Sequence, residues 1–330
     1  MFYTAEIGFG GEPLREFSDA VRISGLPEAQ VFAEAVPGNW AAALRQLAGV
    51  LPDDGPSIVV LDELPYLMDP DGAFESVLQR SWDRELSRKP VLLVLVGSDL
   101  SMMEALTSYG RPFYQRGTQL RVGPLNPADV AAMAGLPAAE AFDAALVTGG
   151  LPIICARWRH GEDTRSFLAR ELAFLGPHLA EVDRMRSDLT MARIERSWSD
   201  WRGRAVEPLV REGLARLLPA QGIPAVPVIG GYWTRSNDVE IDIVGADRAP
   251  VARQLLFLGS VKWLETGQFD EHDLVALQRH RDRVTADPVP LIAVSRSGVS
   301  TTHADAAFTP ADLMQAWVTG SRGVPSQPQR

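Results

Sequence analysis

Two short runs of uninterrupted apolar residues constrain the fold of this chain more than any other feature. They are Ile58 to Leu61 and Val91 to Val96. A strand that is apolar on both faces is typical of a parallel sheet covered by helices on both sides. Segments with helical periodicity separate such runs, so the chain is predicted to begin with a doubly wound α/β domain.

The same periodicity predicts the order of elements along the chain. In the N-terminal part we expect strands at Phe2–Ile7, Val31–Ala35, Ser57–Leu61 and Val91–Val96, and helices at Pro13–Ile23, Trp40–Leu51 and Gly72–Arg88. From Pro152 to about Leu218 the pattern is helical. A second α/β unit should follow, with a hairpin of Gly230–Trp233 and Val239–Val244, a strand at Gln254–Trp263, a helix at Asp270–Val284 and a strand at Pro290–Ser295.

Composition and length exclude several classes of protein. With 330 residues, of which 46% are hydrophobic, the chain can fill the cores of two domains. No apolar run approaches the roughly 18 residues that a membrane-spanning helix needs, and the N-terminus lacks the pattern of a signal peptide. The sequence therefore predicts a soluble, cytoplasmic protein without a membrane partner. The single cysteine, Cys155, cannot form an internal disulfide, which fits a reducing compartment.

The charge of the chain is unevenly distributed. The net charge is −10, yet residues 201–330 carry 14 basic and 14 acidic residues, so the acidic excess lies before them. An acidic protein is not expected to coat nucleic acid nonspecifically. A balanced C-terminal half with clustered arginines leaves room for a local phosphate-binding groove.

A first group of polar residues follows the apolar strands. Asp62 and Glu63 come directly after one strand, and Ser98 follows the next. In a P-loop NTPase, an aspartate at this place binds Mg²⁺ and the following glutamate orients or deprotonates the attacking water. A hydroxyl at the neighbouring strand end can contact the γ-phosphate or that water. The alternative is that the acids are a solvated strand end and that Ser98 caps a helix.

The order of short motifs around these residues resembles that of the archaeal-type ATPases, which belong to the STAND and AAA+ groups of P-loop proteins. The motifs are Leu61–Leu67 (LDELPYL), Val96–Glu104 (VGSDLSMME), Tyr109–Pro112 (YGRP), Gly123–Leu125 (GPL) and Thr148–Pro152 (TGGLP). The resemblance implies ATP and Mg²⁺ as cofactors, Asp62 and Glu63 as the Walker B residues, Ser98 as sensor 1, and Arg111 as a phosphate-sensing arginine.

Two features depart from that family. The sequence contains no G-x-x-x-x-G-K-[ST], so the phosphate loop and its lysine are missing. The glycines of Gly8–Gly11 follow a strand but lack the lysine and the hydroxyl, and we interpret them as a flexible turn. The segment between Pro152 and Arg204 is also too short for the winged helix that the family usually carries.

The C-terminal motifs resemble the restriction-endonuclease-like domain, of the PD-(D/E)XK type, that closes many members of this family. They are Gly203–Val210, Gly230–Trp233 and Val239–Val244. Strand periodicity places Asp238, Glu240 and Asp242 on one face, with Val239, Ile241 and Ile243 on the other, and it places Ser260 and Lys262 on a common face.

The resemblance implies particular roles for these residues. Asp242 would bind Mg²⁺, Lys262 would steady the attacking water or the developing phosphate charge, and Glu207 would match the acid of the first helix. Strand periodicity adds Glu240, which shares the face of Asp242 and is expected to bind Mg²⁺ in place of the acid missing at Ser260. Ser260 stands where an active nuclease has a carboxylate, and a neutral hydroxyl is a weak ligand for a hard cation. The alternative is a fold kept for packing or binding after catalysis was lost.

The sequence therefore predicts an α/β protein in four regions: a partial ATPase domain lacking the phosphate loop (1–152), a helical connector (153–200), an endonuclease-like domain (201–318) and a disordered tail (319–330). We expect a truncated or degenerate ATP-binding protein that binds DNA and cleaves it weakly or not at all. The basic residues expected along a DNA groove are Arg202, Arg204, Arg235, Lys262, Arg279 and Arg281. The alternatives are a Mg²⁺-dependent DNA endonuclease on an ATPase scaffold, and a noncatalytic module that binds protein assembly partners.

Overall fold

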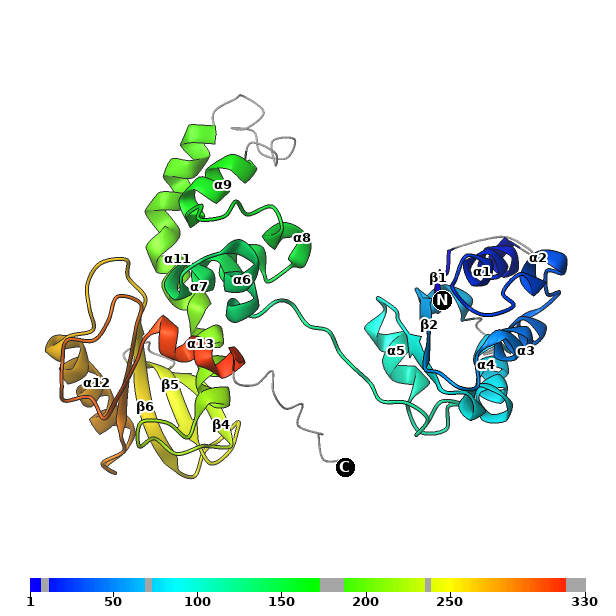
Figure 1. Ribbon diagram of the computed structural model, residues 1–330. Helices are drawn as coiled ribbons and strands as arrows, with labels where there is room; N and C mark the ends of the chain where they lie inside the picture. The colour runs from blue at the N-terminus through cyan, green and yellow to red at the C-terminus, as the bar shows by residue number, and fades with distance from the viewer. Residues whose placement is uncertain (7–11, 69–72, 173–186, 235–238, 319–330) are drawn as a thin grey trace. The chain divides into compact units, whose positions relative to one another are not determined.

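The computed structural model describes residues 1–6, 12–68, 73–172, 187–234 and 239–318 (Figure 1). It divides into two compact units, Met1–Val122 and Gly123–Arg330, which we call unit 1 and unit 2. The expected turn at Gly8–Gly11, the acid Asp238, the basic residue Arg235 and the tail 319–330 lie outside the described residues.

Unit 1 contains a three-stranded parallel sheet in the order β1-β2-β3. The strands are β1 (Phe2–Thr4), β2 (Ser57–Asp62) and β3 (Val91–Leu95), which confirms three of the four predicted strands. The helices are α1 (Glu12–Arg22), α2 (Val31–Glu34), α3 (Trp40–Val50), α4 (Ala73–Arg84) and α5 (Leu100–Leu106), with 3-10 turns η1 (Leu64–Leu67) and η2 (Leu86–Arg88).

The prediction of a strand at Val31–Ala35 was wrong, because this segment forms helix α2. Phe32 is 2% exposed, and its ring packs edge-on against that of Phe17. The buried ring of Phe32 thus anchors the single turn of α2 on the core of unit 1. A segment this short does not contain enough apolar positions to distinguish the helical period from the strand period.

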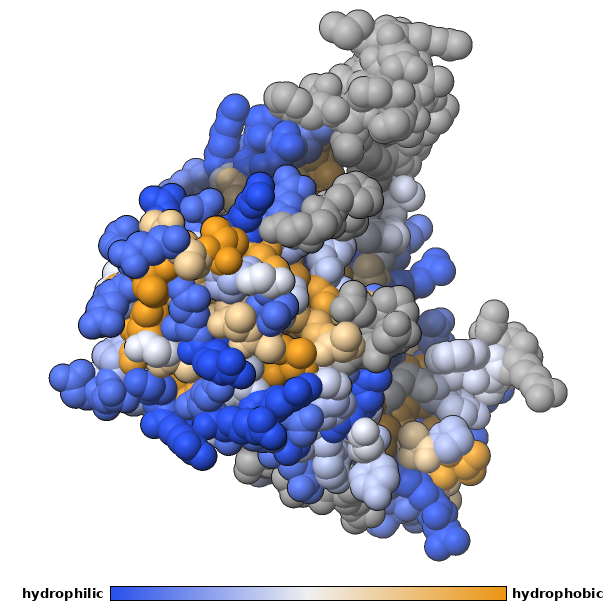
Figure 2. Space-filling model, turned by 90° about the vertical axis from the view of Figure 1, so that its right-hand side faces the viewer, coloured by the Kyte–Doolittle hydropathy of each residue, from blue (hydrophilic) through white to orange (hydrophobic). Residues whose placement is uncertain are grey.

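The two faces of the unit 1 sheet are covered unequally. In Figure 1, helices α1 to α4 lie to one side of it, where Tyr3 and Leu61 are buried. On the opposite face Phe2, Ile58 and Leu92 are 60%, 57% and 60% exposed, and Ile58 pairs directly with Leu92. Apolar side chains thus reach the surface of unit 1. Figure 2 shows a face of the molecule on which hydrophobic residues also lie exposed among hydrophilic ones.

Unit 2 contains a five-stranded mixed sheet in the order β4-β5-β6-β7-β8. The strands are β4 (Val228–Trp233), β5 (Glu240–Ala246), β6 (Leu255–Lys262), β7 (Leu291–Ser295) and β8 (Ala306–Phe308). The first three are antiparallel neighbours, which confirms the predicted hairpin, and β6, β7 and β8 are parallel. The chain is therefore an α/β protein with a parallel sheet and a second, mixed sheet.

Helices cover both faces of the unit 2 sheet. They are α6 (Pro127–Ala134), α7 (Ala138–Thr148), α8 (Pro152–Cys155), α9 (Thr164–Leu172), α11 (Ser187–Leu217), α12 (Glu271–Val284) and α13 (Pro310–Val318). Leu274 of α12 packs with Leu258 on one face, and Val206 of α11 packs with Phe257 and Leu313 of α13 on the other. Because α6 and α7 pack against α11 and α13, the division between the units falls after Val122 and before the predicted boundary at residue 152.

The described helices are short or polar relative to a membrane span. Among the described residues, no single helix is both long and apolar enough to cross a bilayer. Helices α6 and α7 meet the length and composition limits only as a pair, and they are bent by 102° at their junction.

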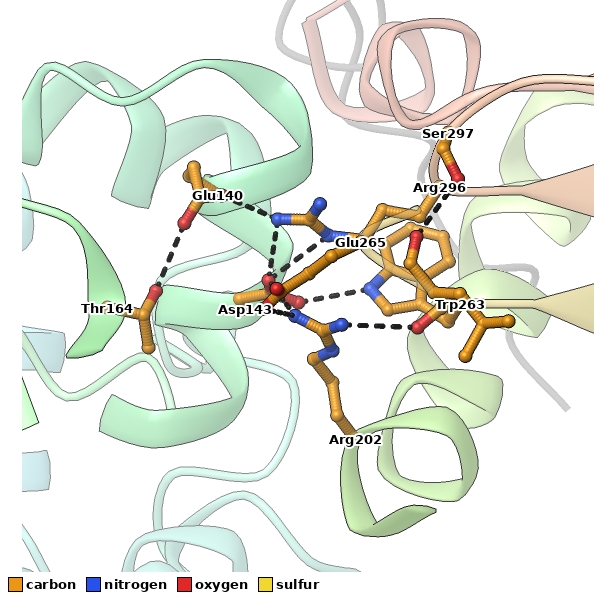
Figure 3. A network of polar contacts seen from close by, with 9 residues as sticks. Glu140, Asp143, Thr164, Arg202, Trp263, Glu265, Arg296 and Ser297 are labelled. Atoms are coloured by element: carbon orange, nitrogen blue, oxygen red, sulfur yellow. Dashed lines mark hydrogen bonds and ion pairs between the residues drawn. The ribbon is translucent and has the colours of Figure 1, made fainter. Parts of the chain in front are cut away.

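A buried network of ion pairs ties the helices of unit 2 to its sheet (Figure 3). Asp143 of α7 accepts hydrogen bonds from Arg202 of α11 at 2.9 Å, from Arg296 at 3.0 Å and from the indole of Trp263 at 3.0 Å. Asp143 and Arg202 are each 1% exposed. The prediction that Arg202 lines a groove was therefore wrong, because this guanidinium is enclosed by its acidic partner.

Candidate functional site

Asp62, Glu63 and Ser98 lie together at the carboxyl ends of β2 and β3. The carboxylate of Asp62 accepts a hydrogen bond from the hydroxyl of Thr4, at the end of β1, at 3.1 Å. Glu63 has a left-handed backbone (φ 52°), which is uncommon for a residue with a Cβ, and its carboxylate accepts a hydrogen bond from Ser98 at 3.2 Å. The structure brings the predicted residues together, and their catalytic role stays a prediction.

Arg111 is engaged elsewhere in unit 1. Its guanidinium binds the carboxylate of Glu75 on α4, at 2.5 Å. The Glu75 side chain is 1% exposed, and its burial raises the pKa of this carboxyl while Arg111 acts in the opposite direction. Arg111 therefore compensates a buried acid, and its predicted contact with a phosphate remains a prediction.

The described part of unit 1 does not fit the phosphates of ATP. A phosphate cradle combines backbone N–H groups of a Gly-rich loop with a lysine. The chain has two lysines, Lys89 and Lys262. Lys89 binds the carboxylate of Asp53 at 2.6 Å and the carbonyl of Leu51 at 3.0 Å. It precedes β3 and so lies at the amino end of the strand that leads to Ser98, whereas Lys262 belongs to unit 2.

Asp242 is held where β5 and β6 separate. Backbone pairing between the two strands begins at Ile243 and Gly259 and does not include Asp242. One carboxylate oxygen of Asp242 accepts hydrogen bonds from the hydroxyl of Ser260 at 2.9 Å and from the backbone N–H of Val261 at 2.7 Å. The side chain thus takes the place of a ladder hydrogen bond, next to the serine that replaces the expected acid.

An irregularity in the pairing of β5 with β4 changes the predicted alternation along β5. Ile241 packs in the cluster that contains Leu274 of α12, and Ile243 packs in the cluster that contains Val206 of α11. The prediction that these two isoleucines share a face was therefore wrong. The register with β4 shifts here, because Gly230 pairs with Val244 and Tyr232 pairs with Ile241, so β5 contains one extra residue between them and its alternation changes.

Glu207 of α11 completes a pair of carboxylates with Asp242. Arg211 connects the two residues, because its guanidinium donates to the Glu207 carboxylate at 3.1 Å and to the backbone carbonyl of Asp242 at 2.7 Å. Burial and then the charge of Asp242 raise the pKa of Glu207, with a smaller contribution from Glu240, while Arg211 lowers it. Carboxylates that repel one another fit a divalent cation, because Mg²⁺ between Asp242 and Glu207 would remove the repulsion.

Lys262 lies on β6, and its ammonium group is directed to α12. It binds the carboxylate of Asp273 at 2.5 Å, and the same carboxylate accepts the backbone N–H of Asp270 in the capping box of α12. Glu240 has an exposed side chain, and its carbonyl oxygen lies 2.8 Å from a ring nitrogen of His280. Glu240 thus stands beside the carboxylate pair, whereas the ammonium group of Lys262 is paired on the α12 side of the sheet, and the catalytic roles of both stay predictions.

The arginines predicted to contact DNA lie on α11 and α12. Arg204 and Arg279 are exposed, and within the described ranges neither forms an ion pair. Arg281 is paired with the neighbouring Asp282 at 2.9 Å. Arg235 lies outside the described residues.

Sequence reasoning missed Arg211 and Asp273. Arg211 follows Glu207 by four residues on a helix, which is the spacing of an i,i+4 ion pair and was the available signal. Asp273 follows Asp270 by three residues, as in a capping box. Its contact with Lys262 had no signal in the local sequence.

Comparison with known proteins covers part of the chain. A family described as "Archaea bacterial proteins of unknown function" (DUF234) matches residues 172–285. No curated protein matches the chain. Among solved structures, the Walker-type ATPase PABY2304 of Pyrococcus abyssi shares 16% sequence identity and a TM-score of 0.28, over 63% of this chain and 60% of that one. This chain thus spans about 60% of the length of that protein. The segment matched by the family contains Glu207, Asp242, Ser260 and Lys262, whereas Asp62, Glu63 and Ser98 lie outside it.

Proposed function

We propose that this chain binds nucleic acid through the carboxylate site of unit 2 and cleaves it weakly or not at all. The observation that carries the proposal is the grouping of Asp242 with Ser260 and Glu207 around the point where β5 and β6 separate. Carboxylates grouped at a strand end, with a lysine further along the neighbouring strand, are the residue types of a metal-dependent phosphodiester site.

Each side chain has a defined role in this proposal. Asp242 and Glu207 would hold Mg²⁺, with Glu240 as the exposed acid beside them. When bound, Mg²⁺ would activate water and neutralise charge on a phosphate. Lys262, on β6, would contact the phosphate with its ammonium group. It would have to give up its ion pair with Asp273 to do so. Ser260 contributes no charge, so the site lacks one of the anionic ligands that hold a hard cation tightly.

Unit 1 has a supporting role in this proposal. Its Asp62, Glu63 and Ser98 stand as a group at the strand ends, which is the observation in favour of a nucleotide-binding origin. The described residues supply no lysine and no phosphate cradle there. We therefore assign to unit 1 a structural role, in a protein of ATPase-like origin that does not hold ATP by these residues alone.

Salt titration of DNA binding tests the proposal. Binding of a fluorescent DNA should weaken steeply between about 50 and 200 mM salt, because phosphate contacts release counterions. Arg204→Ala should weaken binding to all sequences and reduce the salt slope by about 1, because Arg204 is exposed and lies one helical turn before Glu207.

Arg216→Ala is the matched control for this experiment. Arg216 lies on the same helix, in its last turn, where it is also exposed and is paired with Glu212. Its loss should leave the slope unchanged. The absence of DNA binding even at low salt would refute the proposal and favour a module that binds protein partners.

A further inference from the structure

An indole side chain stands at the rim of the carboxylate site. Trp233 is the last residue of β4, and it is paired with Glu240 of β5 in the antiparallel ladder. Directly opposite residues of such a ladder project to the same side of the sheet, with Cβ atoms about 5 Å apart. Strand β4 is at the edge of the sheet, so no further described strand covers the indole from beyond it.

The indole has no structural role among the described residues. Trp233 is 70% exposed. Trp263, which directly follows β6, is by contrast 2% exposed and donates a hydrogen bond to Asp143. No described side chain forms a ring contact with Trp233. Leaving an indole in water forgoes the free energy of burying its apolar surface. A flat, rigid and uncovered side chain of this kind is typical of residues that bind a ligand.

The neighbours of Trp233 indicate the kind of ligand. Glu240, Glu207 and Asp242 are acids suited to a metal-bound phosphate, and Arg204 is an exposed cation on the helical stripe of Glu207. A nucleotide is the group that presents a flat aromatic face at a fixed distance from a phosphate. Bases inside a duplex are stacked on one another and do not present that face, whereas unpaired bases stack on aromatic side chains.

We propose that Trp233 stacks on an unpaired base, so that the site takes single-stranded nucleic acid or a frayed strand end in preference to an intact duplex. This inference rests on the proposed nucleic-acid binding and adds the class of substrate. Each base stacked on an aromatic side chain contributes enough to change affinity by about 5- to 150-fold.

Fluorescence anisotropy with two probes tests the inference in the full chain. The probes are a short oligo-dT strand and a blunt duplex of the same length, each titrated with Mg²⁺ and, in parallel, with EDTA, at about 50 mM salt. We expect the single strand to bind at least about tenfold more tightly than the duplex. Trp233→Ala should weaken binding of the single strand by about 5- to 150-fold and leave duplex binding nearly unchanged, and Trp233→Phe should retain most of the affinity.

Two controls separate the possible outcomes. Tyr109→Ala removes an aromatic ring that is 89% exposed in unit 1, and it should leave both affinities unchanged. Equal affinity for the two probes, unaffected by Trp233→Ala, would overturn the stacking role and leave the proposed function standing. If neither probe binds, the proposed function fails together with this inference. Because Trp233 is exposed, both of its variants should show the circular dichroism and the thermal unfolding of the parent chain.

Discussion

At the scale of single residues, Ser260 is the position that would limit metal binding under the proposed function. Its hydroxyl donates to Asp242, so it orients the acid without adding charge. Arg211, which lies beside both Glu207 and Asp242, offsets part of the repulsion that a cation would otherwise relieve. Hydrogen bonds from the neutral Ser260 and Val261 and from the basic Arg211 therefore orient Asp242 and Glu207.

Replacing this serine by an acid should strengthen metal binding. We expect Ser260→Glu to raise the affinity for Mn²⁺ by about tenfold or more, because ligand charge sets the affinity of oxygen sites for hard cations. Calorimetric titration with Mn²⁺ measures the change. Ser260→Gln adds nearly the same volume without charge, and it should not raise the affinity.

The same variants show whether the native site is catalytically silent. The unaltered chain should cut DNA weakly or not at all with Mn²⁺, and Ser260→Glu should increase cleavage. Robust cleavage by the unaltered chain, lost in both Asp242→Ala and Lys262→Ala, would contradict this expectation. It would mean that Glu207 or Glu240 already supplies the missing charge.

Single residues also show what local sequence reasoning misses. Strand periodicity and the family resemblance predicted that Asp242 and Ser260 belong to one site. In the structure the Ser260 hydroxyl donates a hydrogen bond to the Asp242 carboxylate. Arg202 was expected at the surface, yet it is buried against Asp143, which lies 59 positions earlier in the chain. A contact over that distance leaves no periodic signal, so the burial of an arginine is decided by packing that the local sequence does not reveal.

At the scale of elements, α11 links the helices of unit 2 to its site. The helix runs from Ser187 to Leu217 and carries Arg202 in the buried network and Glu207 in the site. Trp263 follows Lys262 directly and donates to the same Asp143. The network therefore fixes both α11 and the end of β6 relative to α7.

Removing the central acid of this network should destabilise unit 2 strongly. Asp143→Ala leaves Arg202 buried without its main partner, and breaking a buried ion pair in this way costs about 3–5 kcal/mol. Chemical denaturation followed by tryptophan fluorescence measures the loss. Glu265→Ala is the control, because Glu265 also binds Arg202 but is 48% exposed, and its loss should cost less than about 1 kcal/mol. Equal losses in the two variants would contradict the dominant role of Asp143.

Elements differed in how well their type could be predicted. Long periodic segments such as Trp40–Leu51 and Asp270–Val284 were identified within a residue of their observed ends. The short segment at Val31 was assigned to the wrong class, and β8 and α13 were not anticipated. Short elements carry few apolar positions, so their structure is set by the core against which they pack.

At the scale of the whole molecule, the residues predicted to bind a nucleotide are grouped but, within the described part of unit 1, lack a phosphate cradle. Asp62, Glu63 and Ser98 lie together, whereas Lys89, the lysine of unit 1, is paired with Asp53 at the amino end of β3. We expect the chain to bind ATP and Mg²⁺ with no saturable micromolar affinity, because Mg²⁺ ligation does not replace a phosphate cradle. Isothermal titration calorimetry measures this. A micromolar dissociation constant that disappears in Asp62→Ala would show that another segment holds the phosphates.

The parallel pairing of β7 with β6 and β8 sets the smallest piece of this chain that should fold around the site. A fragment cut at the limits of the family match, residues 172–285, would keep β4 to β6 and α12 but would lose β7, β8, α13 and Asp143. Strand β6 would then become a bare edge, since Ser260 and Lys262 lie opposite Ala293 and Ser295 of β7. Such a fragment should aggregate by edge pairing. Expression of residues 123–318, which retains every described strand of the mixed sheet, is the appropriate choice for work on the isolated site.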